Sequence, residues 1–322
     1  MQRLHFKNIV WLLLAVLGFV VLNTLVEMGI INRFYQITLV TIMLNIIYAT
    51  GLNLVLGVAG QFSLGHAGFI AIGAYSGAIF TKAMDNSFQG LLVGMAVGAL
   101  ISILLALLVG VPTLRLKGDY LAIATLGVGE IVRVIINNLK SITNGPAGIS
   151  GVPLVTSWQL VYFFLVLTTI FILNYVYSSA GRATMSIQQD EIASEAMGVN
   201  VTKYKVVAFV IGAITAAIGG ALNASYLGIV TPGDYTYAKS IDILIIVVFG
   251  GIGSFTGTFV AAILLGLLNV LLQDYGQLRM IIYGVAVILI MIFRPGGLLG
   301  TSELRLGRLV EKLFKGRKET SL

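Results

Sequence analysis

The sequence predicts an all-α membrane protein, a polytopic bundle of about ten transmembrane helices that forms a single domain over residues 1–322. Composition supports this, because 58% of the residues are hydrophobic and only 10% are charged, whereas a soluble domain carries about 25% charged residues. The hydrophobic residues are also gathered into runs of the length that crosses roughly 30 Å of hydrocarbon. The 38 glycines suit helices that pack closely through small contacts in lipid.

Ten apolar runs define the expected spans, with nine or eleven spans as the alternatives. The eighth run is short and punctuated by glycine, so we expect it to be broken or tilted. In chain order the runs are Ile9–Met28, Tyr35–Gly57, Ser63–Ala83, Leu91–Val111, Tyr120–Asn138, Trp158–Tyr177, Val206–Ile229, Ile241–Gly253, Thr256–Leu272 and Leu278–Phe293.

The basic residues predict the orientation of the bundle. An even number of spans puts both termini on one side, and Lys and Arg gather on the cytoplasmic side. With the N-terminus inside, fourteen of the 20 Lys and Arg residues lie inside, five lie outside, and Arg133 lies within a span. We therefore expect both termini in the cytoplasm, and no nucleic-acid partner for the net charge of +7. A cleavable signal peptide is not expected, because the first run is too long and no small-residue cleavage site follows it.

The longest polar interruption inside the chain is the segment 179–205, which this topology places in the cytoplasm. Ser186 and Gln189 form a capping-box pattern that predicts a helix start, and Gly198 suits the position just past the helix end. The apolar and acidic residues are separated: Ile192, Ala193, Ala196 and Met197 share one face, and Asp190, Glu191 and Glu195 lie largely off it. The segment predicts a short surface helix that offers an apolar stripe to a partner.

On the other side of the membrane, the loop Leu139–Ser157 contains the sequence NGPAGISGVP over Asn144–Pro153. Its glycines and prolines are turn residues and favour a fixed shape. An ordinary connecting loop and a docking or gating surface are equally favoured interpretations of it.

The C-terminal segment 295–322 predicts an amphipathic cytoplasmic tail. Its apolar residues recur at helical spacing, opposite a face of Arg and Lys, and are Leu306, Leu309, Val310, Leu313 and Phe314. A membrane anchor is the favoured interpretation.

Charged residues within the spans are few. Glu130 and Arg133 lie three residues apart in the fifth run, so they can pair on one helix face, and we interpret them as a structural ion pair. Asp242, near the end of a span, is the remaining acidic residue that could be unpaired there.

Enzyme signals are nearly absent. The two histidines are far apart in the chain, His5 in the N-terminal segment and His66 in the turn Ser63–Gly68, and there is no Cys, so neither has a partner with which to bind a metal. His66 is interpreted as a helix-end partner. The chain has no Gly-Lys pair and hence no P-loop, so any ATP hydrolysis requires another polypeptide. We expect no catalytic residue, no cofactor and no metal.

Glycine and alanine patterns predict close helix packing. The second interpretation is that these small residues line a substrate path. The small-residue pairs are Gly73 with Gly77, Gly94 with Gly98, and Gly253 with Gly257, beside the run Ala213–Ala221. A short internal echo is also present, since Gly57–Gly65 resembles Gly250–Gly257.

Several stretches together resemble one family. They are Gly51–Leu54, Gly60–Phe69, Gly118–Leu126, Asn144–Pro153, Asp190–Gly198, Gly250–Ser254 and Arg294–Leu298. In these the chain resembles the membrane-spanning permeases of bacterial ABC importers for branched-chain amino acids, and in particular their M-type subunits. The resemblance implies an importer-type fold in the bacterial inner membrane. It also implies a second, homologous permease, two ATP-binding cassette subunits, and a periplasmic or extracellular amino-acid-binding protein as partners.

The resemblance further implies a role for the segment 179–205 as a coupling helix that sits against the ATPase. The residues that fall on its pattern are Asp190, Glu191, Glu195, Ala196 and Gly198. The Glu-Ala-Ala-x-x-x-Gly form of other importers is not reproduced, since Gly198 follows Glu195 by three residues. A merely structural surface helix is the alternative.

Two other functions are weighed against uptake of aliphatic amino acids by alternating access. The first is a permease of a related importer for sugars, nucleosides or amides, which no identified residue excludes. The second is a gradient-driven secondary carrier, which predicts deep, unpaired ionisable residues, and the sequence is poor in these. A membrane enzyme is least favoured.

Overall fold

The computed structural model describes residues 2–84, 87–113 and 118–272, together with separate positions between 275 and 300, and its side chains are described from residue 13 onward. The predicted last span, 278–293, and the predicted amphipathic tail, 295–322, lie largely outside the described residues.

Nine long helices occupy the described chain, and each overlaps one of the first nine predicted runs. They are α1 (Gln2–Glu27), α2 (Arg33–Asn53), α3 (His66–Ala83), α4 (Phe88–Thr113), α5 (Asp119–Asn138), α7 (Trp158–Tyr177), α10 (Val201–Leu227), α11 (Tyr237–Gly250) and α12 (Phe255–Leu271). The shorter elements are the π-helical turn Leu54–Val58, α6 (Lys140–Thr143), the 3-10 turns Gly145–Ala147 and Pro232–Tyr235, α8 (Ser179–Gln189), α9 (Glu191–Ala196), β1 (Ile149–Ser150) and β2 (Ile229–Val230).

The all-α membrane architecture is confirmed, but not the expected number of about ten spans. In the part of the chain that the structure describes, four helices are long and apolar enough to cross a membrane: α2 with its π-helical turn, α4, α7 and α10. The number rises to five if α11 and α12 count together as one broken span. These two helices are bent by 120° relative to each other. The bend follows from Gly251 and Gly253, which both take positive φ between the two helices.

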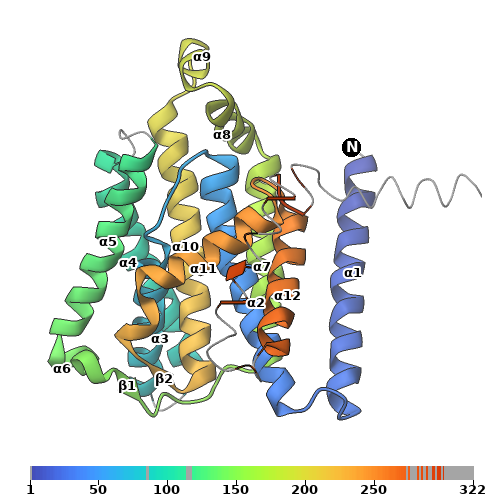
Figure 1. Ribbon diagram of the computed structural model, residues 1–322, viewed down its shortest axis with the longest axis vertical. Helices are drawn as coiled ribbons and strands as arrows, with labels where there is room; N and C mark the ends of the chain where they lie inside the picture. The colour runs from blue at the N-terminus through green and yellow to red at the C-terminus, as the bar shows by residue number, and fades with distance from the viewer. Residues whose placement is uncertain are drawn as a thin grey trace, which may run out of the picture.

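The centre of the bundle is a close contact of α10 with α3 and α4 (Figure 1). Gly73 of α3 faces the backbone of Ala217 on α10, and a Cβ at Gly73 would collide with it. One turn further along α3, Gly94 of α4 lies against Gly77. The small residues therefore let three helices approach more closely than larger side chains would allow, as the sequence predicted.

The two ends of the bundle differ in structure. At one end α8 and α9 project beyond the other helices, and α1 begins at the same end (Figure 1). At the opposite end lie α6 and the antiparallel pair of β1 and β2, in which Ile149 pairs with Val230. We call these the α9 end and the loop end.

The two glycine turns of the internal echo meet in space. Gly57, in the π-helical turn after α2, lies against the backbone of Gly253. Asn53 fixes this contact: its side-chain oxygen accepts from the Gly253 N–H at 2.8 Å, and its amide donates to the Ser254 carbonyl at 3.0 Å and to the Thr258 hydroxyl at 3.0 Å. One side chain thus ties the turn between α11 and α12 to α2.

His66 has the helix-end role that the sequence suggested. It is the first residue of α3 and is buried, and its Nε2 lies 3.1 Å from the Tyr48 carbonyl oxygen of α2.

Candidate functional site

The segment 179–205 forms two helices and the start of a third, rather than the single short helix expected. Ser178 begins α8, since its hydroxyl accepts from the Gly181 N–H at 3.2 Å. Ser186 lies inside α8, where its hydroxyl donates to the Ala183 carbonyl at 2.9 Å. The prediction of Ser186 as an N-cap was wrong, because a serine inside a helix can satisfy its hydroxyl on the preceding turn.

Asp190 is the residue that starts the projecting helix α9. Its backbone is extended, and one carboxylate oxygen accepts from the N–H groups of Ile192 and Ala193, each at 3.0 Å. This satisfies two donors that the first turn would otherwise leave free. Gly198 follows the helix with a φ of +84°, so it occupies the end position that the sequence predicted.

The apolar stripe of α9 is exposed to an unusual degree. The side chain of Ile192 is 77% exposed and that of Met197 is 85% exposed. Glu195 and Ala196 are exposed beside them, and Ser194 faces the bundle. Full burial of a side chain such as Ile or Met contributes about 1.5–3 kcal/mol, so a partner that covered this stripe would gain several kcal/mol.

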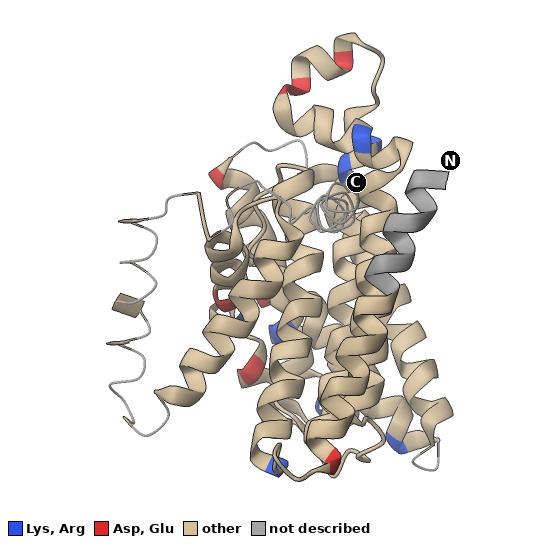
Figure 2. Cartoon of the chain, turned by 90° about the vertical axis from the view of Figure 1, so that its right-hand side faces the viewer, with Lys and Arg blue, Asp and Glu red and all other residues tan. Residues whose placement is uncertain are grey.

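The base of α9 is fixed to the bundle. Glu191 forms a salt bridge of 2.9 Å with Lys205, which lies in the second turn of α10. Asn200 caps α10 by accepting from the Lys203 N–H at 3.0 Å. Acidic residues of α9 and basic residues at the start of α10 lie close together at this end (Figure 2). This salt bridge therefore joins α9 to α10, which lies at the centre of the bundle.

The five residues of the predicted coupling site thus have different structural roles. Asp190 is the cap, Glu191 is bound to Lys205, and Gly198 provides the turn. Glu195 and Ala196 remain exposed. Sequence reasoning missed Lys205 as a partner, because it placed that residue in a polar segment before the helix rather than on it.

At the loop end, hydrogen bonds fix the connection between α5 and α7, as its turn residues predicted. The Asn144 backbone is left-handed with a φ of +61°, and its side-chain amide donates to the Gly148 carbonyl at 2.9 Å. Gly148 also has positive φ and packs against Val230 of β2. The Val152 N–H donates to the Gly228 carbonyl at 3.0 Å. The loop is therefore a formed surface.

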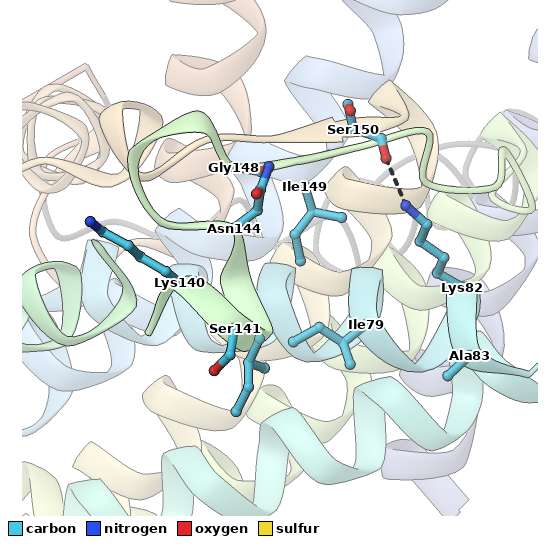
Figure 3. Close-up of a pocket in the computed structure, with 10 residues that line it drawn as sticks. Ile79, Lys82, Ala83, Lys140, Ser141, Asn144, Gly148, Ile149 and Ser150 are labelled. Carbon is cyan, nitrogen blue, oxygen red and sulfur yellow. Dashed lines mark hydrogen bonds between the residues drawn. The ribbon is translucent and has the colours of Figure 1, made fainter. Parts of the chain in front are cut away.

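A pocket of about 380 Å³ opens on this surface beside α3 (Figure 3). Its lining is mixed polar and apolar, from α3, α6 and β1: Ile79, Lys82, Ala83, Lys140, Ser141, Ile142, Asn144, Gly148, Ile149 and Ser150. The Lys82 ammonium donates to the Ser150 carbonyl at 3.2 Å, which joins α3 to β1. Two lysines thus give the pocket a positive character.

Glu130 and Arg133 of α5 pair as predicted, at 2.7 Å. The second Glu130 oxygen accepts from the Tyr237 N–H, the first residue of α11, at 3.2 Å. The pair therefore joins α5 to the start of α11.

These features define a helical integral membrane protein. It has a surface helix with exposed apolar side chains at one end and a fixed loop surface that carries two lysines at the other. The chain belongs to the family described as the permease component of branched-chain amino acid transport systems, whose model matches residues 34–293.

Three curated relatives are similar to the chain over most of its length. The permease protein LivM of the high-affinity branched-chain amino acid transport system of Salmonella typhimurium is 38% identical over 293 residues, which cover 80% of this chain and 68% of that protein. LivM of Escherichia coli K12 is 37% identical with the same coverage. LivH of Salmonella typhimurium, a permease protein of the same kind of system, is 25% identical over 80% of this chain and 91% of that protein. No solved structure matches the chain.

Proposed function

We propose that this chain is the membrane-spanning permease subunit of an ATP-driven importer for branched-chain amino acids, and that it moves its substrate by alternating access. The observation that carries the proposal is α9, a capped helix that projects from the bundle with Ile192 and Met197 uncovered. The substrate class comes from the chain's family and from the names of LivM and LivH, which are permease proteins of branched-chain amino acid transport systems.

The second permease of this assembly is a homologous chain. LivM and LivH are both named as permease proteins of branched-chain amino acid transport systems, and this chain is similar to both. Two permeases that share one ancestry can form a pseudosymmetric pair around a central path. ATP hydrolysis then takes place on two ATP-binding cassette subunits, since this chain has no Gly-Lys pair from which to build a P-loop.

The coupling residues act at α9. The stripe of Ile192 and Met197, with Glu195 and Ala196 beside it, sits in a groove of the ATPase subunit. Asp190, Glu191 and Gly198 hold the helix in shape and attach it to α10. ATP must favour one conformation of the permease, because a ligand that binds both states equally shifts neither.

The chain crosses the inner membrane ten times with both termini in the cytoplasm. In this arrangement α1, α3 and α5 also cross, α11 and α12 contribute one crossing each, and the apolar run that the sequence predicts at 278–293 is the last. The α9 end is then cytoplasmic, which agrees with the preference of Lys and Arg for that side. The loop end faces outward, where the pocket with Lys82 and Lys140 offers positive charge to an acidic surface of an amino-acid-binding protein.

Reconstitution tests the proposal. Proteoliposomes that contain this chain, the second permease, the two ATPase subunits and the binding protein should accumulate leucine only when ATP and every partner are present. Competition by isoleucine and valine, but not by a sugar or a nucleoside, would set the substrate class. Accumulation of leucine by the lone chain on a sodium or proton gradient would overturn the proposal in favour of a secondary carrier.

A further inference from the structure

Charged residues lie between the two ends of the bundle as well as at them (Figure 2). Among these, Lys239 and Asp242 of α11 lie one helical turn apart. Their charges attract each other, but within the described part of the chain neither side chain forms a salt bridge. Glu130 and Arg133 are different, because their charges are in contact and the second Glu130 oxygen is occupied by Tyr237. The α11 pair is open, whereas the α5 pair is closed.

Lys239 lies beside a polar and an aromatic side chain of α2. Its ammonium donates to the Asn45 side-chain oxygen at 3.3 Å and lies 5.7 Å from the centre of the Tyr48 ring. Tyr48 is only 2% exposed, and its buried hydroxyl has no hydrogen-bond partner among the described residues. A buried hydroxyl without a partner costs about 1–3 kcal/mol, so a group that arrives to bind it is favoured. A cation on α11 and a hydroxyl without a partner among the described residues therefore belong to neighbouring helices.

Asp242 is exposed on the same helix. A carboxylate within a membrane-spanning element costs about 2.5–3.5 kcal/mol if it faces lipid, so such groups face water or protein. The helix that carries it is short and ends at the glycine turn where α11 bends by 120° into α12. Broken helices of this kind are tolerated where they line a cavity, and in transporters they mark the substrate path.

We propose that Asp242 and Lys239 form a substrate contact in the translocation path, in which the Asp242 carboxylate binds the α-ammonium group of an amino acid and Lys239, with the Tyr48 hydroxyl, binds its α-carboxylate. The inference rests on the proposed function and extends it to particular residues. It explains why a chain with so few charges keeps an open pair on a broken helix: the zwitterion loses its hydration in the path and needs both charges replaced.

The first test asks whether position 242 faces water, and it requires no transport. The chain has no cysteine, so Asp242→Cys carries its only thiol. In the assembled complex, the membrane-impermeant cation 2-(trimethylammonium)ethyl methanethiosulfonate should label this thiol, and leucine with ATP should slow the labelling. Leu104→Cys on α4, a position 59% exposed in the apolar surface, is the control that should stay unlabelled. Absence of labelling at position 242 would overturn the inference.

The second test measures leucine uptake by the full reconstituted complex. Asp242→Asn should lower the initial rate about tenfold, which corresponds to roughly 1.4 kcal/mol, while Asp242→Glu should restore most of it. Glu27→Gln is the control, because it removes an acidic charge from an exposed residue at the end of α1, away from α11, and it should change little.

The outcomes separate the inference from the proposed function. If the unmodified complex imports no leucine, the proposed function fails, and labelling at position 242 still decides whether the open pair faces water. If the unmodified complex imports leucine and Asp242→Asn imports it equally well, only the inference fails. Loss of the second permease from the purified Asp242→Asn complex would also overturn it, because Asp242 would then be an interface contact.

Discussion

The α9 end and the loop end keep their shapes in different ways. At the α9 end, a helix of six residues is held by the Asp190 cap and by the salt bridge between Glu191 and Lys205, while its apolar side chains stay uncovered. At the loop end, a strand pair, left-handed residues and backbone hydrogen bonds fix the main chain. The contrast teaches that the α9 end leaves apolar side chains exposed, whereas hydrogen bonds fix the main chain at the loop end. Substitutions should therefore affect coupling at the first end and folding at the second.

Glu195→Lys should give the largest effect on transport and the sharpest version of this contrast. Reversal of an exposed charge beside the apolar stripe should lower ATP-dependent leucine uptake about tenfold, which is the loss of roughly 1.4 kcal/mol of contact between subunits. The thermal stability of the purified chain should not change. Glu27→Lys, which reverses an exposed charge at the end of α1, is the control. Unchanged uptake in Glu195→Lys would contradict the coupling role.

Gly148→Ala, at the loop end, should instead lower the stability of the fold. Alanine must take positive φ there, and its Cβ would collide with the Val230 carbonyl. We therefore expect the free energy of unfolding to fall by about 2–3 kcal/mol. Gly151→Ala is the matched control, because its φ is also positive but no atom lies near the added Cβ, and about 1 kcal/mol is expected. Thermal unfolding in detergent measures both. Equal losses would mean that the contact with β2 does not matter.

Arg133→Ala should have an intermediate effect, on assembly rather than on coupling. It leaves Glu130 without its cation, although that carboxylate still accepts from the first residue of α11. Because the pair is only partly buried, we expect the stability of the fold to fall by about 1–2 kcal/mol. The amount of folded chain in the membrane should fall more than the preference among leucine, isoleucine and valine changes. A changed preference with a normal amount of protein would make Arg133 a path residue.

Asp190→Ala should give the smallest effect, confined to α9. Loss of the cap costs about 1 kcal/mol, and Asp190→Asn should preserve it, because the amide oxygen can accept the same hydrogen bonds. Hydrogen exchange should speed up at residues 191–196 in the alanine variant alone. Faster exchange throughout α10 would show that the cap supports more than its own helix.

Much of this arrangement follows from the sequence, because long apolar runs, glycine turns and close charge spacings are local signals. They predicted the positions of nine helices, the turn at Gly198, the pairing of Glu130 with Arg133 and the fixed loop at residues 139–157. What they missed depends on contacts between distant residues or on competition between neighbours. Ser186 and Asp190 can both cap a helix, but only Asp190 does so, because Ser186 lies inside α8 with its hydroxyl bound to the Ala183 carbonyl. The turn between α11 and α12 packs against Gly57 and is hydrogen-bonded to Asn53, and both residues are about two hundred positions away in the sequence.

The three hydrogen bonds of Asn53 have a mechanical consequence. They join residues about two hundred positions apart, and they lie at the turn where α11 bends into α12. If α11 moves, this turn stays fixed to α2, whereas the contacts at the far end, from Tyr237 to Glu130 and from Lys239 to Asn45, have to change. The charged residues of α11 therefore lie toward the end of the helix that is farther from this fixed turn, where any change in its angle has to rearrange their contacts.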